Sequence, residues 1–355
     1  MLDHSQALDQ ALNFLKIFVA PHAAEIDRSP DAIRLAFDEM GKQNLMALKR
    51  GMEYGGPGIS EQEFRIFQEE CARASGTFAF LQTQHQSAAS LIGGSENSTL
   101  KQEYLPKMGD GRKLVGIGFS QLRRPGKPIM TATPTDGGFI LNGLVPWVTG
   151  WSYYSEFLIG ATLPDGSALF LLVPLIEQKG IKVSPPMELA AMASAMTVSV
   201  NFEDFFVQDD LAAFTRPPGW ITASDQVNLA LQGHFAIGCS LAGLDVLESA
   251  AMKRNSEKIQ AVLEALRTEL KCCREATAEA QLLSGDDTTE QRLFVRAWAI
   301  DLAFRCAQAA VISSSGAANS LQHPAQRIYR EALVFSVSAQ TTTIMEASLS
   351  RLIRQ

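Results

Sequence analysis

The sequence predicts an α+β protein with three domains: an N-terminal α-helical domain over residues 1–113, a small central β-barrel or sandwich over residues 114–212, and a C-terminal four-helix-bundle-like domain over residues 213–355. Apolar residues recur every three or four positions in the first and last thirds of the chain, as in amphipathic helices, and alternate in the middle, as in strands. A chain of 355 residues is also too long for one average hydrophobic core.

The first third is expected to be helical. Apolar residues follow the helical period, as in Leu12, Leu15, Ile17 and Val19, and then in Ile33, Phe37, Met40 and Leu45. Proline and glycine interrupt helices, so we expect breaks at Pro30, at residues 53–60 (Glu-Tyr-Gly-Gly-Pro-Gly-Ile-Ser) and at residues 93–94 (Gly-Gly).

The middle of the chain is expected to hold short strands. Residues 157–161 and 169–173 are apolar segments separated by a Pro-Asp-Gly turn, and residues 198–202 alternate. Residues 137–143 (Gly-Gly-Phe-Ile-Leu-Asn-Gly) suggest two strand pieces around turn residues. Clustered short strands of this kind favour a compact barrel or sandwich.

The last third, after Pro217 and Pro218, is again helical and predicts three or four long helices. Breaks are expected near residues 255–256, at residues 285–287 and around Gly316. The small residues Gly238 and Gly243 allow helices to approach closely, so this bundle is expected to pack on neighbouring subunits too.

Composition narrows the function. Hydrophobic residues make up 46% of the chain and charged residues 19%, which is typical of a well-buried globular protein. The net charge of -7 and the lack of a basic block argue against nucleic acid as a partner. The sequence shows no apolar run that predicts a membrane span. The amphipathic, acid-containing N-terminus lacks the basic start of a secretory signal, so a cytoplasmic location is expected.

The cysteines predict neither a disulfide framework nor a metal site. Their number, five, is odd, and their spacing matches no metal-ligand pattern. Cys272 and Cys273 are adjacent in a helical pattern, where a disulfide between them would be strained. We expect reduced cysteines and no metal.

Several segments, taken together and in order, resemble the acyl-CoA dehydrogenase family over essentially the whole chain. The resemblance in the first domain rests on residues 20–27, 53–60, 69–73 (Glu-Glu-Cys-Ala-Arg) and 104–107 (Tyr-Leu-Pro-Lys). In the β domain it rests on residues 141–143 (Leu-Asn-Gly), 147–149 (Trp-Val-Thr) and 202–207. In the bundle it rests on Gly316 and on residues 323–332, 341–345 and 349–351.

The resemblance implies an FAD site. Trp147 and Thr149 match the stretch beneath the flavin ring, where an indole can cover one face of the isoalloxazine and a hydroxyl can donate to it. From the residues alone, Trp147 also reads as a core aromatic. The implied cofactor-binding residues are Ser120, Trp147, Thr149, Arg254, Gly316, Thr341 and Thr343. In the family the adenosine and pyrophosphate site is completed by a second subunit, so a homodimer or homotetramer is expected.

The sequence departs from the family where the chemistry needs a base. Family enzymes remove a proton beside a thioester carbonyl with a glutamate. An ungapped match places that glutamate at Ala339 and the following glycine at Gln340, and the alternative glutamate position on the first bundle helix falls on Asn228. Neither alanine nor asparagine is a base at neutral pH.

Three other residues are candidates for catalysis. Asp225 lies one helical turn before Asn228, although it also fits a helix N-cap. His85 could face a flavin pocket, as in monooxygenases that resemble this fold, or be a satisfied core histidine. His234 lies six residues beyond Asn228.

The phosphate contacts also differ from the family. The family's Thr-Glu-Pro loop becomes residues 120–126 (Ser-Gln-Leu-Arg-Arg-Pro-Gly), in which only Ser120 keeps a hydroxyl. Arg123 and Arg124 could replace the lost contacts, because guanidinium groups suit phosphate geometry, or could be solvated surface residues.

Three readings of the function follow. The first is an acyl-CoA dehydrogenase-like, FAD-dependent oxidoreductase with an altered substrate or reaction, acting on a small molecule such as an acyl-CoA thioester and passing electrons to a partner. The second is a non-catalytic oligomeric scaffold of the same fold. The third is a flavin monooxygenase or oxidase that uses His85.

Overall fold

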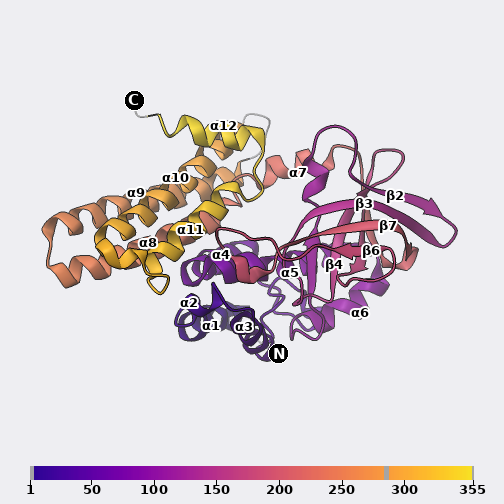
Figure 1. Ribbon diagram of the computed structural model, residues 1–355, viewed down its shortest axis with the longest axis horizontal. Coiled ribbons are helices and arrows are strands. Elements are labelled where there is room, and N and C mark those ends of the chain that lie inside the picture. The colour runs from indigo at the N-terminus through magenta and orange to yellow at the C-terminus, as the bar shows by residue number, and fades with distance from the viewer. Residues whose placement is uncertain (1–3, 284–287, 354–355) are drawn as a thin grey trace.

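The computed structural model describes residues 4–283 and 288–353. The bundle helices lie at one end, the strands at the other, and the N-terminal helices lie against both (Figure 1). This is the predicted sequence of a helical domain, a β domain and a helical bundle.

The N-terminal helices begin and end where the sequence predicts. Pro30 is the first residue of α3, and the side chain of Ser29 caps it. Ser60 and Glu63 form a capping box at the start of α4, and Gly93 ends α5. The elements are α1 (His4–Phe14), the π-helical turn η1 (Leu15–Val19), α2 (Ala23–Ile26), α3 (Pro30–Lys42), η2 (Met52–Tyr54), α4 (Glu61–Ala74), α5 (Gly76–Gly93) and α6 (Ser98–Met108).

The central strands form one eight-stranded mixed sheet with the order β6-β7-β3-β2-β4-β5-β8, and β1 pairs with β4. The expectation of two strand pieces within residues 137–143 is wrong. Gly137 belongs to the turn before β3, and the register shift between Leu141 and Gly143 is a bulge inside that strand. The strands are β1 (Val115–Gly118), β2 (Met130–Thr135), β3 (Gly138–Val148), β4 (Glu156–Thr162), β5 (Ala168–Pro174), β6 (Ile181–Val183), β7 (Val198–Gln208) and β8 (Ala212–Arg216).

The C-terminal helices form the predicted bundle. Asn255 adopts a left-handed conformation and ends α8, and the Ser256 side chain caps α9, which confirms the break expected there. Gly316 lies in the short helix η6, whereas the break expected at residues 285–287 falls outside the described residues. The helices are α7 (Trp220–Asn228), α8 (Gly233–Arg254), α9 (Glu257–Leu282), α10 (Thr288–Ser314), η6 (Ser315–Asn319), α11 (Pro324–Val337) and α12 (Thr342–Ser350).

One expectation from hydropathy needs correction. The helical stretch from Trp220 to Arg254 is long and apolar enough to cross a membrane by length and composition. However, 61% of its most apolar window is buried within the molecule, because α8 packs against α4, α9, α10 and α11. The apolar character of α8 is therefore that of a bundle core helix.

Candidate functional site

The end of β3 presents the aromatic ring and the hydroxyl that the sequence singled out. The indole of Trp147 is 51% exposed, whereas Thr149 is 7% exposed. The hydroxyl oxygens of Thr149 and Thr197 lie 3.1 Å apart, so one of the two donates to the other. Whichever accepts keeps its own hydroxyl hydrogen for another partner.

A short helix after β1 holds polar atoms that lack a partner. In η3 (Ser120–Arg123), the amide nitrogen of Gln121 donates to the carbonyls of Gly118 and Gly160, at 3.2 and 2.7 Å. This fixes the turn on strands β1 and β4. Within the described residues, the Ser120 hydroxyl and the Gln121 carbonyl oxygen are buried without a hydrogen-bond partner. Buried polar atoms are usually satisfied, so two such atoms in one turn suggest a place where a ligand binds.

Two residues from the predicted set contact each other across this junction. Arg123 donates from Nε and Nη2 to the two carboxylate oxygens of Asp225, with both distances 2.7 Å. Asp225 lies in the middle of α7, whose N-cap is Gly219, so its interpretation as an N-cap is wrong. The carboxylate is held by a guanidinium in bidentate geometry, which fixes its orientation.

The two positions that the sequence match predicts for the family glutamate, Ala339 and Asn228, lie next to segments joined by one buried arginine. Arg296 in α10 is 1% exposed and donates to the carbonyls of Gln232, Phe335 and Ser338. Gln232 follows Asn228 by one helical turn, and Ser338 precedes Ala339. Burial lowers the pKa of Arg296 to about 10, which leaves it charged at neutral pH.

At these two positions no side chain can act as a base. The Asn228 amide donates within α7, to the carbonyl and hydroxyl of Ser224 at 2.8 and 3.2 Å. Ala339 is half-buried and has a φ of +49°, in the left-handed region. Gln340 does not adopt positive φ.

The two threonines of the predicted site help to build the start of α12. The Thr341 hydroxyl caps this helix by accepting from the Ile344 amide at 3.4 Å, and it lies 2.9 Å from the Thr343 hydroxyl. Ile344 packs with Leu229 and Ile300, so α12 and the residues after α7 meet at the same end of the bundle.

The remaining predicted cofactor residues lie elsewhere on the bundle. Arg254 ends α8 and donates to the Ser315 hydroxyl at 3.1 Å, directly beside Gly316. A side chain added at Gly316 would meet no atom within 4 Å. The turn between α8 and α9 lies at the end of the bundle farthest from the sheet (Figure 1).

His85 is a core residue, which does not support the alternative that it faces a flavin pocket. The ring is fully buried and accepts from the Val115 amide at 2.9 Å through Nδ1, while Nε2 donates to the Met108 carbonyl at 3.0 Å. Burial lowers the pKa of His85, which favours this neutral form. Both ring nitrogens are used by the backbone, which matches the other reading of the sequence, a satisfied core histidine.

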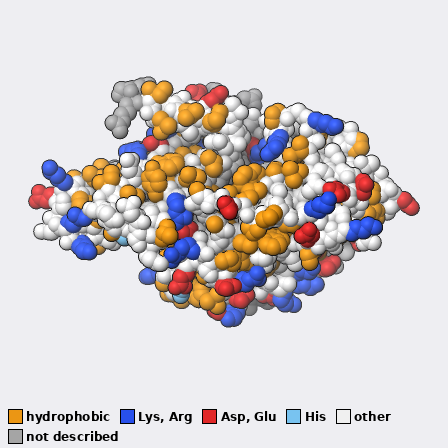
Figure 2. Space-filling view, in the orientation of Figure 1, with side chains coloured by type: hydrophobic (Ala, Val, Ile, Leu, Met, Phe, Trp, Pro, Cys, Tyr) orange, Lys and Arg blue, Asp and Glu red, His pale blue; other side chains and the backbone are white. Residues whose placement is uncertain are grey.

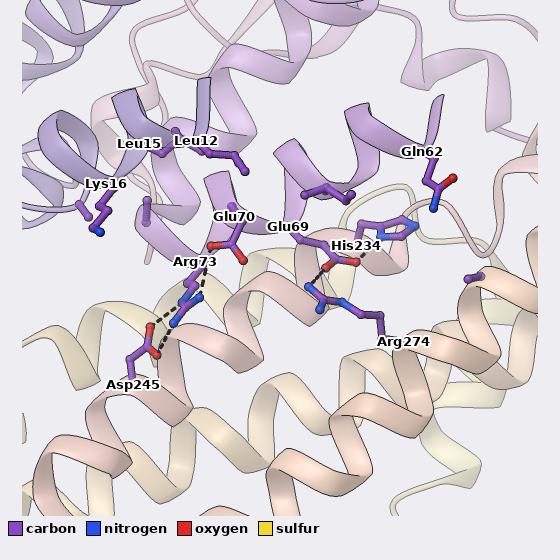
Figure 3. A pocket seen from close by; sticks show the side chains of 14 residues that line it. Leu12, Leu15, Lys16, Gln62, Glu69, Glu70, Arg73, His234, Asp245 and Arg274 are labelled. Atoms are coloured by element: carbon purple, nitrogen blue, oxygen red, sulfur yellow. Dashed lines mark hydrogen bonds and ion pairs between the residues drawn. The ribbon is translucent and has the colours of Figure 1, made fainter. Parts of the chain in front are cut away.

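His234 faces a groove between the N-terminal helices and the bundle (Figure 3). Its Nδ1 lies 2.6 Å from Glu69 Oε1, and its Nε2 lies 2.7 Å from the side-chain nitrogen of Gln281. Arg274 pairs with the other oxygen of Glu69. Because these buried groups satisfy one another, His234 belongs to an interhelical network. The groove, of about 880 Å³, is lined by Leu12, Leu15, Lys16, Ala20, Gln62, Ile66, Glu69, Glu70, Arg73, Ala74, His234, Asp245, Arg274 and Ala278.

Sequence reasoning missed Arg296 and the role of Glu69. Arg296 carried a signal, because it interrupts the apolar run Val-Arg-Ala-Trp-Ala-Ile over residues 295–300. Glu69 contacts residues 165 and 205 positions away in the sequence, and nothing local indicates those contacts. Across residues 4–283 and 288–353, no group of three or more His, Cys, Asp or Glu side chains could hold a metal ion.

Known proteins similar to this chain are acyl-CoA dehydrogenases. Residues 2–112 match the family model described as acyl-CoA dehydrogenase, N-terminal domain. The probable acyl-CoA dehydrogenase YngJ of Bacillus subtilis is 22% identical over 96% of this chain and 94% of its own length. The mitochondrial isovaleryl-CoA dehydrogenase of Oryza sativa subsp. japonica is 24% identical over 95% of this chain and 88% of its own length.

Solved structures agree on the fold. The acyl-CoA dehydrogenase from Geobacillus kaustophilus superposes with a TM-score of 0.80 at 15% identity, over 99% of this chain and 98% of its own. The FAD complex of acyl-CoA dehydrogenase from Bacillus anthracis gives a TM-score of 0.81 at 18% identity, over 98% and 66% of the two chains. This chain has the acyl-CoA dehydrogenase fold, and it is similar to members of that family over nearly its whole length.

Proposed function

We propose that this protein is an FAD-binding, acyl-CoA dehydrogenase-like oxidoreductase whose reaction does not begin with proton removal by a family carboxylate. The observation that carries this proposal is the pair Ala339 and Asn228. Ala339 and Asn228 each lie next to a segment whose backbone carbonyls accept from Arg296. Asp225, the one acid of α7, is paired with Arg123. A positioned general base typically contributes about 100- to 10,000-fold to a proton-transfer step, so its absence changes what the site can do.

The residues present fit FAD. The partnerless Ser120 hydroxyl supplies a buried hydrogen-bond donor, the Trp147 indole supplies an exposed aromatic face, and Thr149 and Thr197 together supply a hydroxyl hydrogen. When bound, FAD supplies a hydride acceptor. The chain's own residues then orient the ring by stacking and hydrogen bonding.

The adenosine end requires a second subunit in this proposal. Arg254 and Gly316 lie at the end of the bundle away from the sheet, so they would serve a neighbour's cofactor. Hydrophobic side chains are also gathered over the bundle in Figure 2. Large exposed ones in α10 to α12 and their connections include Phe294, Ile312, Leu321, Leu333, Val337 and Leu349. Such a surface favours a homodimer or homotetramer.

An acyl-CoA thioester remains the proposed class of substrate. It rests on the relatives' names and on a glutaryl-coenzyme A dehydrogenase solved with glutaryl-CoA, which has a TM-score of 0.81 over 98% of this chain. A separate electron-transfer protein is the proposed acceptor, and the cytoplasm the proposed location.

The test is direct. The purified protein, with and without added FAD, is examined for flavin absorbance in the blue after desalting, and its mass is measured by light scattering at micromolar concentration. The proposal expects a yellow oligomer that shows no more than trace oxidation of straight-chain acyl-CoA substrates with an artificial electron acceptor. Robust oxidation by the unmodified protein would show that another residue is the base. A mass corresponding to the monomer would contradict the proposed oligomeric state.

The second candidate is the non-catalytic scaffold. The missing carboxylates favour it as much as they favour an altered reaction. It predicts a colourless oligomer that does not retain FAD even when FAD is added in excess. The third reading, a monooxygenase or oxidase that uses His85, loses its residue because both ring nitrogens of His85 are bound to the backbone.

A further inference from the structure

Helix α7 is attached to the rest of the protein by few contacts. None of its nine residues is buried, and Val227 is 60% exposed. It follows Pro217 and Pro218, and its N-cap Gly219 has a φ of +81° with open space where a side chain would lie. The next helix, α8, is in contrast a core element of the bundle. Because few contacts hold it, α7 can move as a unit about the connections at its two ends.

Three side-chain contacts hold α7 to the β domain. At its first residue, the Trp220 ring lies 5.4 Å from the Phe170 ring in an edge-on arrangement, and the Arg216 guanidinium of β8 lies over the same indole at 5.9 Å. In its middle, Asp225 receives the bidentate pair from Arg123, with the two side chains 19% and 23% exposed. On the bundle side, Arg292 donates to the Gln226 carbonyl at 3.3 Å. The Arg123–Asp225 pair is thus the main charged contact between α7 and η3.

The turn that carries Arg123 is prepared for a polar ligand. Among the described residues, the buried Ser120 hydroxyl has no hydrogen-bond partner, so it is free to donate to a ligand oxygen. The neighbouring Arg124 is exposed and has no ion-pair partner in the described part of the chain. Two guanidinium groups and a free hydroxyl in one turn match a phosphate ester or pyrophosphate, whose oxygens accept several charged hydrogen bonds.

We propose that the Arg123–Asp225 pair is a latch that holds α7 over η3, and that a phosphate-bearing ligand opens it by taking Arg123 from Asp225. A phosphate carries more charge than a carboxylate and is joined here by Arg124 and Ser120, so it competes for the same guanidinium. In this proposal the phosphate of the ligand, rather than its acyl or flavin part, opens the latch and lets the ligand bind at the junction of the β domain and the bundle. This inference rests on the proposed function only for the identity of the ligand.

The test measures amide hydrogen exchange of α7 in the full-length protein, with α8 amides as the internal reference. Inorganic pyrophosphate is the probe, and sodium chloride at matched ionic strength controls for screening. We expect pyrophosphate to speed exchange in α7 by about tenfold or more and to leave α8 unchanged, as expected for loss of a charged hydrogen-bond pair. The variant D225N should show the fast exchange without any ligand and should bind pyrophosphate more tightly than the unmodified protein.

The variant R123Q distinguishes a latch opened by phosphate binding from a general destabilisation of α7. It should exchange as fast as D225N but bind pyrophosphate about tenfold more weakly, since the charged fork is gone. Unchanged α7 exchange in D225N, or equal pyrophosphate binding by R123Q and the unmodified protein, would overturn the proposal. Separate additions of FAD and of coenzyme A show which source of phosphate opens the latch. The exchange experiment needs no flavin. If the protein does not bind FAD, the proposed function is wrong, but the exchange result still tests the latch.

Discussion

Two junctions in this molecule treat their polar groups differently. Where the N-terminal helices meet the bundle, buried charges are paired. Glu331 of α11 is fully buried, pairs with Arg327 at 2.8 Å, and accepts from the Gly76 amide at 3.0 Å. Asp27 pairs with Arg330, and Glu69 with His234 and Arg274. These groups satisfy each other, as a structural network must.

Where the β domain meets the bundle, the polar groups are incomplete. Ser120 and Gln121 bury atoms that have no partner among the described residues. Within the bundle itself, Arg296 is a buried cation that contacts carbonyls rather than a carboxylate. Paired buried charges are typical of framework, whereas two unpartnered atoms in one short turn favour a place where a ligand binds, although single unpartnered atoms such as Gln82 Oε1 occur in the N-terminal helices too. The difference supports the proposal that the ligand site lies at the second junction, and it groups His234 and Glu69 with the first.

The largest expected effect lies at the complete junction. Replacing Glu331 by alanine leaves Arg327 buried without its counter-ion and the Gly76 amide without an acceptor, which should cost about 3–5 kcal/mol of unfolding free energy. Urea unfolding followed by circular dichroism measures it. Glu346→Ala is the control, because Glu346 is exposed on α12, and it should change stability by less than about 0.5 kcal/mol. A loss below 1 kcal/mol for Glu331→Ala would mean that the pairing is dispensable.

The next effect tests the incomplete junction. Ala339→Glu restores a carboxylate at the family position, and in a flavin-loaded protein it should raise acyl-CoA oxidation by about 100-fold or more. Since Ala339 already adopts positive φ and Gln340 does not, the single replacement is the proper test, without Gln340→Gly. Ala339→Gln is the matched control, because it has nearly the same size and cannot take the proton. Equal rates for the two variants would favour a remade reaction.

His85 gives a smaller effect that depends on pH. Burial places its pKa below the ordinary 6.5, so below pH 6.5 the unfolded chain takes up a proton that the folded protein does not. The contribution of neutral His85 to the free energy of unfolding is therefore complete above pH 6.5. It declines as the pH falls, by up to about 1.4 kcal/mol per pH unit. The slope between pH 7.5 and 5.5 should be shallower in His85→Gln, and identical slopes would contradict the neutral core assignment.

The sequence predicts the order of elements because periodicity and breakers are local signals. Pro30, Gly93 and residues 255–256 mark real boundaries. It fails where the outcome depends on distant partners. The bulge at Leu141 to Gly143 exists because β3 pairs with β7, and Asp225 meets an arginine 102 residues away, which no local pattern indicates. The alanine at position 339 could be recognised from the sequence, because recognising it needs only an ungapped match to the family segment.

The smallest expected effect concerns Trp147, and it separates ligand contact from framework most cleanly. An indole that is 51% exposed contributes little to the core, so Trp147→Ala should change the free energy of unfolding by less than about 0.5 kcal/mol. If the ring covers the flavin, its loss removes a stacking contact worth about 0.5–1.5 kcal/mol, which is about two- to tenfold in the FAD dissociation constant. Titration of FAD followed by flavin fluorescence measures it. Trp147→Phe keeps an aromatic face and should recover most of the affinity. A loss of stability without a change in FAD binding would assign Trp147 to the framework and remove the β3 end from the proposed site.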